Sequence, residues 1–153
     1  RTKVGQAVLA LLERNLKASL LGALTLLPQN ASLANQCRKI RKEDGALDFA
    51  QPAASIDARL RAFTPWPGGY FDHGETRVKV GMCSLAELIT STQPGSVIVA
   101  GETLDVATGM GLLRIHELQR PGGRMLPVSD FLRGYPIEVG EVLLSVPSHS
   151  LLV

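Results

Sequence analysis

The sequence is poor in aromatic residues and cysteines, and each shortage excludes a class of protein. One Trp, two Tyr and four Phe among 153 residues disfavour a barrel that grips single-stranded nucleic acid by base stacking. The two cysteines, Cys37 and Cys83, have neither metal-ligand spacing nor the pattern of a disulfide framework. We therefore expect reduced thiols in a cytoplasmic protein.

Long apolar runs are also missing. The longest candidate, Ala18 to Leu27, is well short of the roughly 18 apolar residues that span a membrane. The chain starts at Arg1 without a signal-peptide pattern, so we expect a piece of a longer protein and no membrane partner.

The sequence lacks a recognisable catalytic or metal-binding group. His73, His116 and His149 are scattered, without a neighbour at metal-ligand spacing. Thr108 to Gly111 is a glycine turn without the helix that a phosphate-binding loop requires. No Ser, Cys or carboxylate pair stands in a nucleophile or acid–base setting. We expect no catalytic, cofactor-binding or metal-binding residues in this segment.

Charge is present but unevenly distributed. Residues 1–66 hold ten Lys or Arg against five Asp or Glu, whereas residues 67–153 hold six against nine. This asymmetry suggests that the first part faces a polyanion. Four basic residues fall within five positions: Arg38, Lys39, Arg41 and Lys42. This run is either a solvated charged turn, partly neutralised by Glu43 and Asp44, or a strip that contacts phosphates.

Apolar periodicity predicts a helical first part. Leucines at spacings of three and four predict an amphipathic helix from Val4 to Leu27, which Pro28 ends. Small polar residues then indicate a linker. A second helix is expected from Pro52 to Phe63, and the run Arg61 to Tyr70 then turns a corner. We interpret that corner as architectural, with Trp66 covering one end of a core.

The remainder shows the alternation of short β-strands. Val78 and Val80 alternate with Arg77 and Lys79, and apolar runs separated by Gly or Pro follow. About five short strands predict a small barrel or sandwich. A short helix is expected from Pro127 to Leu132, and a last strand from Ile137 to Val146 would close the barrel.

The ordered motifs resemble the C-terminal half of methionyl-tRNA formyltransferases. They are Lys39-Ile40, Lys42-Glu43-Asp44-Gly45, Asp48, Arg61-Ala62-Phe63-Thr64-Pro65-Trp66-Pro67-Gly68, Val78-Lys79-Val80, Pro94-Gly95, Thr108-Gly109 and Phe131-Leu132-Arg133-Gly134. The resemblance implies a mainly β, OB-like Greek-key barrel over 51–153. It also implies a linker over 29–50, and a helix over 1–28 that is similar to the end of an N-terminal catalytic domain.

The family transfers a formyl group from 10-formyltetrahydrofolate to the methionyl amino group of initiator tRNA. The resemblance places the catalytic residues and the formyl donor in an upstream domain. It implies that this segment binds initiator tRNA and the catalytic domain of the same chain, and that DNA is not a partner. The resulting candidates for phosphate contact are Arg38, Lys39, Arg41, Lys42, Arg61, Lys79 and Arg124.

Two departures and two alternatives accompany the resemblance. Phe49 stands where the family usually has Trp, and Met125 follows Arg124 where a second basic residue is frequent. The same barrel also occurs in formyltetrahydrofolate hydrolases and dehydrogenases and in sugar formyltransferases. The segment could instead be purely structural.

Overall fold

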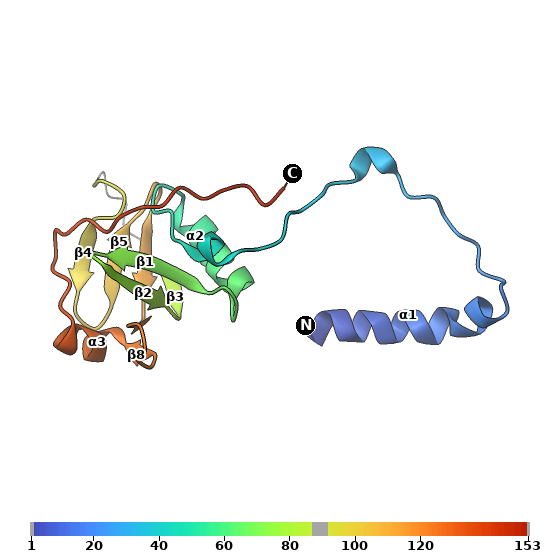
Figure 1. The fold of residues 1–153 in the computed structure, drawn as a ribbon, viewed down its shortest axis with the longest axis horizontal. Coiled ribbons are helices and arrows are strands. Elements are labelled where there is room, and N and C mark those ends of the chain that lie inside the picture. Colours follow the sequence, from blue (N-terminus) through green and yellow to red (C-terminus); the bar gives the residue numbers. More distant parts are fainter. Residues whose placement is uncertain (1, 87–91, 153) are drawn as a thin grey trace. The chain divides into compact units, whose positions relative to one another are not determined.

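The chain divides into two compact units, Arg1–Gln36 and Cys37–Val153. The structure is a computed structural model, and it describes residues 2–86 and 92–152. In the first unit, helix α1 spans Thr2–Leu20 (Figure 1) and a short 3-10 helix, η1, spans Ala31–Leu33. The helix expected to reach Leu27 ends sooner because Gly22 takes a φ of 67°, which stops helical propagation. Within the described ranges, no helix is long and apolar enough to cross a membrane.

The second unit consists mainly of two antiparallel four-stranded sheets. The first sheet has the order β1 (Gly69–His73), β2 (Thr76–Val80), β7 (Glu117–Gln119) and β8 (Leu126–Pro127). The second has the order β3 (Cys83–Ala86), β6 (Leu112–Ile115), β5 (Leu104–Ala107) and β4 (Val97–Ala100).

The two sheets continue into each other at a shared bend. β2 leads into β3 through Gly81 and Met82, and β6 leads into β7 through His116. Across the bend, the amide of Gly81 donates to the carbonyl of Glu117, and that of His116 donates to the carbonyl of Met82, both at 2.9 Å. The strands thus enclose one core, and the expected mainly β, OB-like barrel fold is confirmed.

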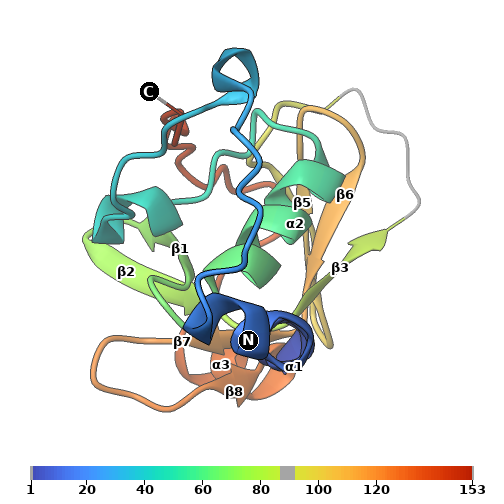
Figure 2. The same ribbon diagram turned by 90° about the vertical axis from the view of Figure 1, so that its right-hand side faces the viewer.

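Helices cover the barrel at two places. α2 (Ala53–Phe63) packs on β3 and β6, and α3 (Val128–Gly134) lies with β8 at one end of the strands (Figures 1 and 2). The predicted apolar face of α2 is buried, with Ile56, Leu60 and Phe63 each at most 4% exposed. Ile56 and Leu60 belong to one hydrophobic core together with Val78 from β2 and Phe131 from α3.

The segment after α3 does not form the expected strand from Ile137 to Val146. Only an isolated bridge pairs Val142 with Ser96, although Ile137 and Leu143 are buried. Gly140 has a φ of 93°, which breaks the extended conformation that a continuous ladder requires. The prediction of a closing strand is therefore wrong, and the segment is held against β4 by separate hydrogen bonds, such as Val97 N to Glu141 O at 2.8 Å.

The compact barrel unit begins earlier in the sequence than Gln51. A 3-10 helix, η2, spans Lys42–Gly45, and residues 44–49, assigned to the linker from the sequence, are buried. Phe49 is fully buried beside Phe71, with ring centroids 6.3 Å apart. The apolar bulk of Phe49 therefore contributes to the barrel core itself.

Candidate nucleic-acid interface

Basic side chains gather around Tyr70 on the outer side of β1 and β2. Because side chains alternate along a strand, Val78 and Val80 of β2 point into the core while Arg77 and Lys79 point out. Tyr70 lies opposite Lys79 in the β1–β2 register, and the Arg77 guanidinium lies 3.9 Å from the Tyr70 ring centroid. A parallel bridge between Ala46 and Tyr70 brings the end of η2 to the same place.

Arg120 extends this cluster along the sheet. It follows β7, whose Gln119 pairs directly with Lys79 of β2. Arg77, Lys79 and Arg120 line one cavity of about 270 Å³, together with Gln119, Pro121 and Gly122. We call the exposed cations Lys39, Arg41, Lys42, Arg77, Lys79 and Arg120 the basic face. Its core is a cavity lined by three cations. Arg77 already pairs with Asp72, with Nε 3.0 Å from Oδ1, so Lys79 and Arg120 supply most of the attraction for an anion.

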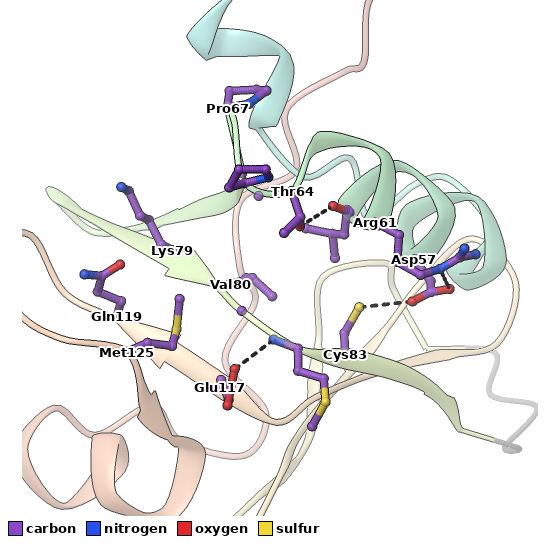
Figure 3. Close-up of a pocket in the computed structure, with 16 residues that line it drawn as sticks. Asp57, Arg61, Thr64, Pro67, Lys79, Val80, Cys83, Glu117, Gln119 and Met125 are labelled. Carbon is purple, nitrogen blue, oxygen red and sulfur yellow. Dashed lines mark hydrogen bonds and ion pairs between the residues drawn. The ribbon is translucent and has the colours of Figure 1, made fainter. Parts of the chain in front are cut away.

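A larger cavity adjoins the basic face. It has a volume of about 640 Å³ and lies between the end of α2, the corner after it, and strands β2, β3 and β7. Figure 3 shows Lys79 beside Gln119 at one side of this cavity and the Arg61–Asp57 ion pair at the other. Arg61 Nε lies 2.9 Å from Asp57 Oδ2, and the Arg61 side chain is 71% exposed. The structure thus brings Arg61 and Lys79 to one cavity.

Arg38 is held within the fold. Its guanidinium donates to Asp44 Oδ2 at 2.8 Å and to Asp44 Oδ1 at 2.5 Å, and its Nε donates to the carbonyl of Ser150 at 3.1 Å. The hydrogen bonds from Arg38, and then the one from the Arg41 amide, hold the pKa of Asp44 far below its usual range. Arg38 therefore fixes η2 and the C-terminal segment to each other.

The remaining candidates are exposed at the surface. Lys39, Arg41 and Lys42 lie on and just before η2, and Arg124 lies in the β7–β8 loop. Two further basic residues, Arg77 and Arg120, belong to the same face although they are not among the candidates predicted from the sequence. The alternation of Arg77 with Val78 could have identified it. Nothing local could have identified Arg120, because only the pairing of β2 with β7 brings it there.

The expectation that Trp66 covers the core is wrong. Its side chain is 56% exposed, whereas the flanking Pro65 and Pro67 line the larger cavity. At this corner Phe63 is the buried aromatic residue, whereas Pro65 is exposed and Pro67 is half-buried, so the indole lies outside.

Replacing Trp66 with Ala should therefore affect stability little. We expect the free energy of unfolding to fall by less than about 1 kcal/mol, the usual range for an exposed position. Because Trp66 is the only Trp, urea unfolding should be followed by circular dichroism. Phe63→Ala, at a position 4% exposed, is the control, with an expected loss of roughly 3 kcal/mol or more. A comparable loss for Trp66→Ala would contradict the exposed placement.

The comparisons with known proteins agree with this architecture. Residues 39–136 match the family described as "Formyl transferase, C-terminal domain", and the chain belongs to that family. Its similar relatives include methionyl-tRNA formyltransferases. The protein of Paraburkholderia phymatum is 39% identical over 121 residues, which are 78% of this chain and 37% of the relative. That of Paracidovorax citrulli is 40% identical over 130 residues, 80% of this chain and 40% of the relative.

The chain thus spans about two fifths of the length of these relatives. Among solved structures, variants of HypX from Aquifex aeolicus are similar in fold. One variant superimposes with a TM-score of 0.59 at 20% identity, covering 88% of this chain and 24% of HypX. HypX in complex with tetrahydrofolic acid superimposes with a TM-score of 0.58 at 18% identity, and the match covers 91% of this chain and 27% of HypX. At such identity the likeness concerns the fold alone.

Proposed function

We propose that this chain is the tRNA-docking C-terminal part of a methionyl-tRNA formyltransferase. The observation that carries the proposal is the basic face, which joins cations from η2, β2 and the end of β7 on a domain of this family. Lys and Arg side chains that contact phosphates position a nucleic acid without reading its bases. Such a face suits the backbone of initiator tRNA.

The formyl transfer itself is proposed to take place in a part of the protein outside this chain. There, 10-formyltetrahydrofolate would supply the formyl group that the methionyl amino group of the tRNA accepts. We assign no residue of this chain to that chemistry. This chain holds the body of the tRNA, while the aminoacylated end lies in the part of the protein that transfers the formyl group. The chain therefore contributes to tRNA binding.

The test is the affinity of this chain for initiator tRNA as a function of salt concentration. Each phosphate that a Lys or Arg neutralises releases counterions, and the slope of log K against log salt is about −0.9 for each contact with a duplex. Binding is measured by fluorescence anisotropy. We expect measurable affinity at low salt and a slope of several units. Absence of binding at low salt would refute tRNA docking by this chain.

A further inference from the structure

The two cavities beside β2 adjoin each other. Lys79 and Gln119 line both of them, with Lys79 on β2 and Gln119 opposite it on β7. One cavity is cationic, with Arg77 and Arg120 added to Lys79. The other is more than twice as large. Its volume of about 640 Å³ is in the range of sites that hold a small organic molecule.

The larger cavity has apolar walls with an unusual composition. Met82 is 58% exposed, Met125 is 38% exposed, and Pro65 and Pro67 line the cavity from the corner. No aromatic ring is among its lining residues. Thioethers are polarizable and adaptable, and they make favourable contacts with the edges and faces of aromatic rings. These walls suit a flat heteroaromatic ring that enters from outside.

Besides the cations Arg61 and Lys79, the larger cavity offers hydrogen-bond acceptors on β7. The Gln119 amide nitrogen already donates to the carbonyl of Gly123 at 2.5 Å, so its carbonyl oxygen is left to accept a hydrogen bond. One carboxylate oxygen of Glu117 accepts from the Met82 amide at 3.3 Å, and among the described residues no donor is recorded for the other. In Figure 3, Met125 lies between Gln119 and Glu117. An exocyclic amino group, such as that of adenine, would satisfy one of these acceptors.

We infer that the two cavities together bind one unpaired RNA nucleotide, with its phosphate among Arg77, Lys79 and Arg120 and its base in the larger cavity. A base inside a duplex is stacked and paired, so only an unpaired nucleotide can enter. The shared Lys79 and Gln119 lie where the phosphate and base of one nucleotide would join. This inference rests on the proposed function, since it takes RNA as the partner and adds a specific site to the phosphate contacts.

The test compares two RNAs on this chain by fluorescence anisotropy. One is a blunt-ended duplex, and the other is the same duplex with a single-stranded extension of adenosines. We expect about tenfold tighter binding of the extended RNA, from the contacts of the base with the two thioethers and its hydrogen bonds in the cavity. An extension of uridines, which lack the exocyclic amino group, should increase the affinity less than an extension of adenosines does.

The variant Met82→Ala/Met125→Ala removes the apolar walls and leaves every charge in place. It should lose the preference for the extended RNA and keep both the affinity for the blunt duplex and the salt slope. The matched control is Met110→Ala, at an exposed methionine outside both cavities, which should keep the preference. Both methionines of the wall are exposed, and thermal melting by circular dichroism checks that the double variant is folded.

The outcomes separate this inference from the proposed function. Equal, salt-dependent binding of both RNAs would overturn the nucleotide site and leave phosphate docking intact. A preference for the extended RNA that survives in Met82→Ala/Met125→Ala would also overturn the site. If initiator tRNA and both duplexes fail to bind at low salt, the proposed function fails, and the inference fails with it.

Discussion

Reversing three lysines of the basic face to glutamate, Lys39→Glu/Lys42→Glu/Lys79→Glu, should weaken the binding of initiator tRNA by about a hundredfold at low salt. All three side chains are exposed, and no ion pair involves them among residues 2–86 and 92–152. Each is therefore available to a phosphate, and losing three contacts of about 1 kcal/mol each gives this factor. The salt slope should fall by about three units, one for each contact.

The control for the lysine reversals is Arg133→Glu. Arg133 is 78% exposed on α3, outside the basic face, and pairs with Asp130 at 2.9 Å. Its reversal changes the net charge by the same amount as one lysine reversal, so it measures the general effect of charge. We expect Lys79→Glu alone to weaken binding several-fold more than Arg133→Glu. Equal effects would mean that net charge, and no particular face, governs the affinity.

Arg38 is not a suitable position for charge reversal, although it is one of four cations within five positions of the sequence. The sequence presents Arg38, Lys39, Arg41 and Lys42 as one run, and composition cannot separate them. The fold does, because η2 turns Asp44 back onto Arg38. A loss of tRNA binding after a change at Arg38 would therefore mix a structural effect with a lost contact.

Local patterns predicted the elements of the barrel better than the site. The face of α2 and the alternation of β2 follow from neighbours in sequence, and the structure confirms both. Arg120 joins Arg77 and Lys79 through a pairing between strands some 40 residues apart, which one sequence does not reveal. The direction of the Trp66 side chain depends on which residues fill the inner side of the corner, and this too is set by tertiary packing.

The predicted strand from Ile137 to Val146 does not form, and the reason is again tertiary. Two of its apolar residues, Ile137 and Leu143, are buried, whereas Val139, Val142 and Leu144 are exposed. A strand also requires an unbroken row of hydrogen bonds, and the φ of 93° at Gly140 interrupts it. A run of apolar residues therefore predicts burial only in part, and it does not by itself predict a ladder.

Replacing Asp44 with Asn should lower the free energy of unfolding by about 2 to 3 kcal/mol at neutral pH. The Asp44 side chain is only 4% exposed and accepts hydrogen bonds from the two terminal guanidinium nitrogens of Arg38, Nη1 and Nη2, and from the Arg41 amide. Asn keeps the shape but loses the charge and one acceptor, and Arg38 is left without its partner. The control is Asp130→Asn in the exposed pair with Arg133, for which we expect less than about 1 kcal/mol.

The pH dependence distinguishes a lost ion pair from a general loss of packing. Arg38 and the Arg41 amide hold the pKa of Asp44 well below that of an unfolded chain, about 3.9 for Asp. A depressed pKa gives stability that is fully present above the unfolded value and is lost as the pH falls through and below it. Urea unfolding of both proteins between neutral pH and about pH 3 should therefore show the difference between them shrinking in acid. A difference that stays constant over this range would show that the ionised carboxylate of Asp44 is not what stabilises the junction of η2 with the C-terminal segment.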